Sequence, residues 1–447
     1  MNSNLEIRRR GLMKPNLQFK SSLILDNHPM KCVNPKMKIH YYMVLEYFVK
    51  QFEDNEYTNF RLNEYRDILL EDSQKPDVTN IPIDNLIRSM LNCTLKPWKK
   101  KYRYLIMCDI ALILLDEINI QKAADSMKLF LSKGKQKQID VVLSVLKNDK
   151  FDKNSINFAA DLIEQYRNNY HFLKRPELRF IVTANMSAGK TTLVNALIGK
   201  SLARTSQEAC TGNICYIYNK PFEDNHIHFE TSQVNLDADV SDIKSVNWTS
   251  VTSTAAYFSH LSEHKFRICI IDTPGVNSTL NKKHGEITRE AIKDESYHKL
   301  IYVLNANKLG TDEEIKYLKW ISENVSMDKI IFVLNKLDDF KSTEDDIEAS
   351  IKGVRNDLLN LGYENPIICP LSAYFALLIK LKHEGGKLTE DEEDEYVLYT
   401  KKFSRPFYNL LKYYEGIEGD INDDEMISMS KKCGLYGLEN MLFGGEL

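Results

Sequence analysis

Residues 184–191, Ala-Asn-Met-Ser-Ala-Gly-Lys-Thr, join an apolar run over 179–183 to a helical run. This feature constrains the fold most, because such a loop directs backbone N–H groups and a helix N-terminus at a phosphate chain. Lys190 supplies a cation for the phosphates and Thr191 a hydroxyl for Mg²⁺. Ala184 replaces the usual first Gly, and Ala is tolerated there if φ stays negative. The residues expected to bind phosphate are Asn185, Ser187, Ala188, Gly189, Lys190, Thr191 and Thr192.

Four more short apolar runs, rich in β-branched residues, follow this loop at 266–271, 299–304, 329–334 and 366–371. Helical segments separate the runs, at 285–297, 311–324 and 344–361. Strands alternating with helices predict an α/β domain with a mostly parallel sheet and helices on both faces. The pattern after 371 is helical again, and Thr389 with Glu392 predicts a capping box.

The chain before this domain has a different period. Apolar residues recur at helical spacing over 36–172, as at Leu105, Cys108 and Leu112, which predicts an all-α domain. Residues 1–35 show no periodicity and are expected to form a poorly ordered arm. The phosphate loop therefore falls in a third region, 173–447. Residues 1–150 carry a net charge of +7 within a total of −4, which favours an anionic partner for the front half.

Composition excludes several classes of protein. The longest uncharged apolar run, 110–115, is far shorter than the roughly 20 residues that span a bilayer. The 8 Cys are too sparse for a disulfide scaffold, and most stand in apolar segments, as in a reducing compartment. Neither a secretory signal nor a nucleic-acid-binding motif is evident, so a cytoplasmic protein is expected.

A second motif, Asp272-Thr-Pro-Gly275, follows the run 266–271 directly. An Asp at a strand end can hold Mg²⁺ through water, and the Gly275 N–H can reach a γ-phosphate. Alone, these four residues indicate only a turn. Behind a phosphate loop, they predict the second half of a nucleotide site.

A third motif, Asn335-Lys336-Leu-Asp338, follows the run 329–334. The Asp338 carboxylate can accept hydrogen bonds from guanine N1 and N2, whereas adenine lacks that pair of donors. Ser372 and Ala373 end the last run, where a backbone N–H can meet guanine O6. The similar segment 307–310 lacks the Asp and follows the preceding strand, so we reject it as the base-reading motif.

Other residues leave alternatives open. Thr211 is the best candidate for a second Mg²⁺-facing hydroxyl, although it also fits an ordinary loop. His226 and His228 alternate as in a strand with outward side chains, which is simpler than a metal site. The cluster 96–103 interleaves cations with Trp and Tyr; it fits an anionic surface such as lipid headgroups, or cations on an exposed helix.

These motifs, in this order, resemble GTPases of the translation-factor class, and segments 185–199, 208–211 and 271–277 resemble bacterial dynamin-like proteins. The resemblance covers roughly 175–445 and implies a P-loop GTPase fold, GTP and Mg²⁺ as ligands, and GTP hydrolysis. It implies roles for Lys190 at the β- and γ-phosphates and Ser187 beside them. The residues implied to hold the metal are Thr191, Thr211 and Asp272.

The same resemblance implies a homodimer formed through the GTPase domain and a peripheral membrane or protein partner for the helical region. Two departures oppose a full dynamin. Met186 replaces a Gln that helps to position the attacking water. The long stalk helices that continue from a dynamin GTPase domain are not expected from the residues after 443. A slow regulatory switch and a membrane-associated scaffold therefore remain alternatives to a GTPase activated by self-association.

Overall fold

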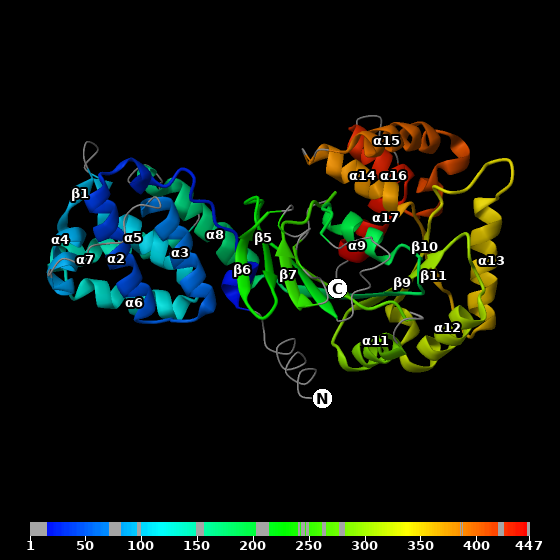
Figure 1. Cartoon of the computed structure of the whole chain (residues 1–447), viewed down its shortest axis with the longest axis horizontal. Helices are drawn as coiled ribbons and strands as arrows, with labels where there is room; N and C mark the ends of the chain where they lie inside the picture. The colour runs from blue at the N-terminus through cyan, green and yellow to red at the C-terminus, as the bar shows by residue number, and fades with distance from the viewer. Residues whose placement is uncertain are drawn as a thin grey trace. The chain divides into compact units, whose positions relative to one another are not determined.

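The computed structural model describes residues 16–70, 82–95, 100–148, 156–202, 214–239, 242, 246, 250–261, 265–276, 282–384, 386, 388–418 and 424–444 (Figure 1). The chain divides into two compact units. The helical unit comprises residues 1–175, 220–228 and 233–237, and the sheet unit comprises 176–219, 229–232 and 238–447. The helical unit thus includes two short segments that the sequence places inside the expected GTPase domain.

The helical unit contains seven α-helices among the described residues. They are α2 (Pro35–Lys50), α3 (Glu56–Leu70), α4 (Ile83–Asn92), α5 (Tyr102–Leu114), α6 (Glu117–Lys128), α7 (Lys133–Lys147) and α8 (Ala160–Lys174). Every residue of α5 is buried, and α2, α3, α4, α6, α7 and α8 all contact it or its neighbours, so α5 is the centre of the core. This confirms a helical N-terminal region, although two short antiparallel strands, β1 (Thr94–Leu95) and β2 (Lys100–Lys101), interrupt the predicted all-α pattern.

The expectation of a loose arm is wrong for residues 16–35. Phe19 is fully buried, and the Arg61 guanidinium, 1% exposed, donates to the backbone oxygen of Ser21 at 3.1 Å. Asn169 accepts a hydrogen bond from the Ser22 N–H at 2.9 Å. The segment has no helical or strand period because it consists of two short 3₁₀ turns, Leu17–Lys20 and Pro29–Cys32, joined by irregular chain.

The sheet has nine strands in the order β11-β10-β9-β3-β8-β4-β7-β5-β6. The predicted five are β3 (Glu177–Ala184), β8 (Arg267–Asp272), β9 (Lys299–Asn305), β10 (Ile330–Asn335) and β11 (Ile367–Pro370). They pair in parallel, as expected. Four further strands were not predicted from the sequence: β4 (Cys215–Asn219), β5 (Ile227–Glu230), β6 (Val234–Ala238) and β7 (Ser253–Ala256). They are short or polar, and β4 runs antiparallel to β8.

The α-helices of the sheet unit are α9 (Lys190–Ile198), α11 (Lys282–Asp294), α12 (Asp312–Asn324), α13 (Ile347–Asn360), α14 (Ala373–His383), α15 (Glu390–Phe403), α16 (Glu425–Lys432) and α17 (Leu435–Phe443). The capping box of Thr389 and Glu392 is confirmed at the start of α15. In the parallel register, Ala184 is level with Val303, and Asn305 is level with Asn335. The motifs that follow these strands therefore meet at one edge of the sheet.

Candidate nucleotide-binding site

The loop between β3 and α9 has the backbone shape of a phosphate cradle. Ala184 is the last residue of β3, so its extended conformation accommodates the Cβ that the usual Gly lacks. Ser187 and Gly189 have positive φ values of 62° and 87°. A Cβ at Gly189 would lie 2.3 Å from Asn335 Nδ2, so only Gly fits both the conformation and the close approach.

The lysine of the loop contacts the aspartate that ends β8. Lys190 and Asp272 form a buried ion pair, with side chains 9% and 1% exposed. This pair brings together two residues that are 82 positions apart in the chain. Thr191 follows Lys190 in the first turn of α9 and carries a hydroxyl, and hydroxyl and carboxylate oxygens are ligands that Mg²⁺ prefers. The donor chemistry of Thr191 and Asp272 therefore fits the expected metal.

Asn335 bridges three of the predicted motifs. Its Nδ2 donates to the Ala188 carbonyl oxygen at 3.0 Å, and its Oδ1 accepts from the Ala373 N–H at 2.9 Å. The amide is 2% exposed. Its position thus ties the phosphate loop to the Ser372–Ala373 turn, a geometric role that sequence reasoning did not assign to it.

The expected base-reading carboxylate, Asp338, is also in place. Its Oδ1 accepts a hydrogen bond from the Ser372 hydroxyl at 2.7 Å, and Ser372 caps α14. Burial raises the pKa of Asp338 above its usual value, while the hydrogen bond from Ser372 acts in the opposite direction. Lys336, between Asn335 and Asp338, has a positive φ of 69° that turns the chain here.

The loop after β8 lies beside the phosphate loop. A Cβ built on Gly275 would lie 3.7 Å from Met186 Cγ, so the Met186 side chain borders the point where Gly275 can offer its N–H. Two hydroxyls brace this loop: Thr273 donates to the Val182 carbonyl at 2.7 Å, and Thr288 of α11 donates to the Pro274 carbonyl at 2.8 Å. Met186 is 43% exposed.

A strand-end residue of the site was not predicted from the sequence. Asn305, the last residue of β9, donates from Nδ2 to the Ser187 carbonyl oxygen at 3.2 Å. The available signal was a polar residue at the end of an apolar run. The rejected segment 307–310 stands after β9 as expected, where Asn307 donates to the exposed Asp339 at 2.9 Å.

Several predicted residues have no described contact with a neighbouring motif. Thr211 lies outside the described residues, as do Lys96 and Lys99 of the basic cluster. Thr192 is half-buried in the first turn of α9. Arg103 is 4% exposed and donates to Gln138 and to the Leu91 carbonyl, so it cannot serve as a free headgroup ligand.

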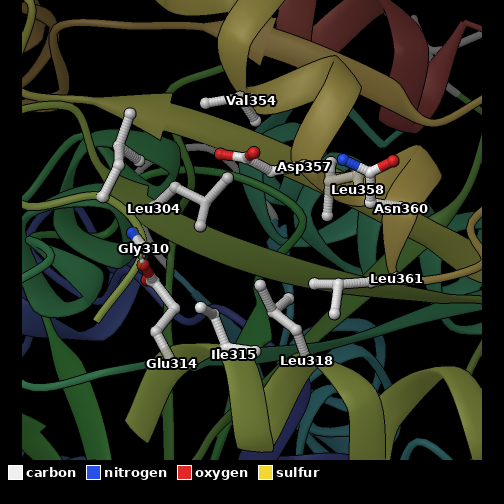
Figure 2. A pocket seen from close by; sticks show the side chains of 11 residues that line it. Leu304, Gly310, Glu314, Ile315, Leu318, Val354, Asp357, Leu358, Asn360 and Leu361 are labelled. Atoms are coloured by element: carbon white, nitrogen blue, oxygen red, sulfur yellow. Dashed lines mark hydrogen bonds between the residues drawn. The ribbon is translucent and has the colours of Figure 1, made fainter. Parts of the chain in front are cut away.

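A pocket of about 360 Å³ lies between α12 and α13, away from these motifs (Figure 2). Its walls are mainly aliphatic, and the buried Glu314 carboxylate accepts from the Gly310 N–H at 3.1 Å. Burial raises the pKa of Glu314. No predicted site residue is among the described residues that line this pocket.

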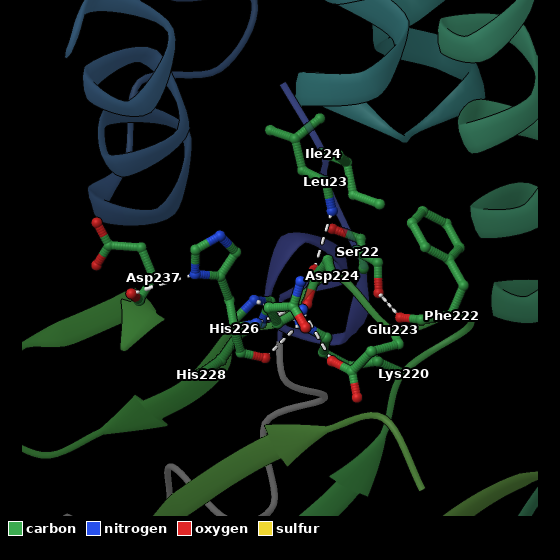
Figure 3. A network of polar contacts seen from close by, with 12 residues as sticks. Ser22, Leu23, Ile24, Lys220, Phe222, Glu223, Asp224, His226, His228 and Asp237 are labelled. Carbon is green, nitrogen blue, oxygen red and sulfur yellow. Dashed lines mark hydrogen bonds and ion pairs between the residues drawn. The ribbon is translucent and has the colours of Figure 1, made fainter. Parts of the chain in front are cut away.

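A second cluster of buried charges belongs to the helical unit (Figure 3). Lys220 Nζ donates to Asp224 at 2.5 Å and to His228 Nε2 at 3.1 Å, and His228 Nδ1 meets the Phe19 carbonyl oxygen at 2.8 Å. The expectation of an outward His228 is therefore wrong: the ring is fully buried, and burial keeps its pKa well below the usual value.

Within the described part of the chain, no group of three or more His, Cys, Asp or Glu side chains is arranged to hold a metal. No described helix has both the length and the apolarity that crossing a bilayer requires.

Comparison with known proteins gives a family for the central part of the chain. Residues 181–337 match the model of the dynamin family. An uncharacterized protein in the xynA 3′ region of Caldicellulosiruptor sp. (strain Rt8B.4) is 27% identical over 299 residues, 62% of this chain and 68% of the relative. A probable transmembrane GTPase, FZO-like and chloroplastic, of Arabidopsis thaliana is 26% identical, covering 51% of this chain and 22% of the relative.

Dynamin-like protein 1 of Campylobacter jejuni (strain 81-176) is 22% identical, covering 50% of this chain and 35% of the relative. The chain thus spans about a third or less of the length of the last two relatives. The family match begins within β3, includes the phosphate loop and the Asp272 turn, and ends at Leu337, one residue before Asp338. The chain therefore carries a dynamin-family GTPase domain, with bacterial dynamin-like relatives over about half of its length.

Proposed function

We propose that this chain binds GTP with Mg²⁺ and hydrolyses it to GDP and phosphate, and that pairing of two GTPase domains accelerates the reaction. The observation that carries the proposal is the Asn335 bridge, because it joins a phosphate cradle to a turn beside the buried Asp338 carboxylate. A guanine base read by Asp338 would then be connected by its ribose to phosphates held at Lys190 and Gly189.

The chemistry starts from an exchange of partners. When phosphates enter, the Lys190 ammonium leaves Asp272 for the β- and γ-phosphate oxygens. Asp272, through water, and Thr191 would hold Mg²⁺, which neutralises charge on those oxygens; the family resemblance adds Thr211. Water attacks the γ-phosphorus, its oxygen forms the new bond, the bond to the β-phosphate oxygen breaks, and the water protons pass to phosphate and solvent.

Met186 supports a second candidate, a slow nucleotide switch. A thioether beside Gly275 cannot orient a water molecule as an amide does, and positioning supplies most of the catalysis in phosphoryl transfer. An isolated monomer should therefore turn over slowly. Pairing would offset this defect by placing Thr211 at the γ-phosphate.

The test is GTP turnover per molecule over a hundredfold range of protein concentration, with Mg²⁺ saturating and with or without anionic liposomes. Rising specific activity that Thr211→Ala abolishes supports activation by pairing; Met186→Gln should raise the basal rate. A flat profile favours the switch, and absence of turnover with intact GTP binding excludes the enzyme. Stimulation by liposomes that salt removes would identify a weakly held membrane partner.

A further inference from the structure

The loop that follows Asp338 is held by a side chain from outside the recognised motifs. Lys402, near the end of α15, donates from Nζ to the main-chain oxygen of Asp338 and, at 2.7 Å, to that of Phe340. Lys402 is half-buried, so these charge-assisted hydrogen bonds are partly shielded from water. They fix the peptide plane directly after the base-reading residue.

Tyr408 completes this arrangement. Its hydroxyl donates to the Phe340 oxygen at 3.1 Å and accepts from the Ser342 N–H at 3.0 Å. The Lys402 ammonium lies 4.6 Å from the centre of the Tyr408 ring, a cation–π contact. Tyr408 is 4% exposed, so the ring and the ammonium form a packed support for residues 338–342.

The same segment also supports the Ser372 hydroxyl that donates to Asp338. Phe403, next to Lys402, is fully buried, and its ring stacks on Phe375 with centroids 5.1 Å apart. The Phe375 N–H donates to the Ser372 hydroxyl oxygen at 3.3 Å, and that hydroxyl donates to Asp338. Neighbouring residues of α15 therefore reach Asp338 by two routes.

We propose that Lys402 is a positioning residue for guanine selection, which holds Asp338 where its carboxylate reads the base, with Tyr408 as its support. The inference rests on the proposed GTP binding and adds a determinant that lies beyond residues 181–337, the part matched by the family model. Lys402 itself does not touch the nucleotide; it acts through the backbone of the Asp338 loop.

The charges around Asp338 set its pKa, and a purely structural role of Lys402 would not change this property. Burial raises the pKa of Asp338, and the nearby Asp339 adds to this, whereas Ser372 and the positive charge of Lys402 lower it. Tyr399 of α15 also faces Asp338, and its own pKa is raised to about 12, mainly by burial. Removing the Lys402 charge should therefore raise the pKa of Asp338 further. The loss of guanine-nucleotide affinity on acidification should then begin at a higher pH.

The experiment measures the affinities of the full chain for GDP and ADP across pH. Lys402→Met should weaken GDP binding by about tenfold and leave the weak ADP binding unchanged. The ratio of the affinity for GDP to the affinity for ADP should therefore fall. The pH at which GDP affinity is half lost should be higher in this variant. Lys402→Arg should recover most of the ratio, since it keeps the charge and two donors, and Lys401→Met is the matched control on the exposed neighbour.

A Lys402→Met protein with the normal ratio and midpoint would overturn the proposal, as would equal losses for GDP and ADP, which indicate general damage. If Lys402→Met does not fold, Tyr408→Phe decides: we expect the ratio to fall by about threefold, and an unchanged ratio contradicts the role. An unmodified chain that binds GDP and ADP equally refutes the selectivity for guanine in the proposed function, and this result is independent of the Lys402 variants.

Discussion

The two units use buried aspartates in different ways. In the helical unit, Asp109 of α5 is fully buried and accepts from Tyr65 at 3.0 Å, from His28 at 3.1 Å and from Tyr41. In the sheet unit, Asp272 pairs with Lys190 at the end of a strand. A carboxylate surrounded by donors stabilises a fold, whereas one paired with a single lysine beside a phosphate loop can exchange that partner for a ligand.

Burial alone therefore does not identify a functional carboxylate. Asp109 and Asp272 are equally inaccessible, at 0% and 1% exposed. They differ in what a substitution should damage: stability in the first case and nucleotide binding in the second. This difference can be tested one residue at a time.

The largest effect is expected in the helical unit. Asp109→Ala should lower the free energy of unfolding by about 3 kcal/mol or more, because it leaves buried hydroxyl and imidazole donors without an acceptor. Denaturant unfolding measures this loss, and the exposed Asp125→Ala is the control. If GDP affinity, measured under conditions where the variant is folded, also fell by tenfold, the proposed separation of roles would be wrong.

Lys190→Ala should reverse that pattern. Losing the charge-assisted contact to the β- and γ-phosphates costs about 1.5–3 kcal/mol, so GTP binding should fall by at least tenfold. The free energy of unfolding should also fall, because the buried Asp272 loses its partner, but the fold should persist since the change is confined to one strand end. Titration with a fluorescent GTP analogue tests this, with Lys316→Ala on α12 as control; normal binding and turnover would mean that the loop is misassigned.

Asp338→Asn should change which base is bound. The amide can donate to the 2-oxo group of xanthine, so preference should shift from guanine to xanthine nucleotides by about tenfold. Competition between GDP and XDP measures the shift. Asp339→Asn, at the exposed next position, should keep the original preference, and a shift there as well would indicate a loop effect.

The smallest effect is in the pH dependence. Since burial raises the folded pKa of Asp338, GDP affinity should fall as pH decreases through that pKa, above the usual range of an Asp. Without nucleotide, the free energy of unfolding should have the opposite pH dependence. The contribution of Asp338 to stability is present at low pH and is lost as pH rises through the folded pKa. Binding and unfolding measured from about pH 8 down to about pH 4, near the ordinary pKa of an Asp, test both signs, and Asp338→Asn should remove both.

The sequence predicted the parts of the site that local chemistry specifies. The loop 184–191, Asp272 and Asn335 to Asp338 were placed after strands that the structure contains. Asn305 and Lys402 were missed because a polar strand end and a helical lysine have no distinctive local pattern; their roles depend on which neighbours the fold supplies. The assignments of Thr211 and of the metal ligands remain predictions.

The errors have the same origin. His228 alternates with His226 as an outward strand residue would, yet the Phe19 carbonyl and Lys220 enclose it. Residues 16–35 have no period, and Arg61 and Asn169 nevertheless order them. In each case a distant residue determined the outcome, and a local pattern contains no information about such a partner.

The sequence by itself determined the α/β class, the helical front region and the strand–loop–helix elements that suit a phosphate, because hydrophobic period and glycine placement act over a few residues. Only the tertiary structure decided that Lys190 contacts Asp272, that Asn335 joins the phosphate loop to Ala373, and that Lys402 holds the Asp338 loop. These contacts connect positions that are far apart in the chain. They exist because parallel strands bring their carboxyl ends to one edge, where the polar groups of separate segments satisfy one another.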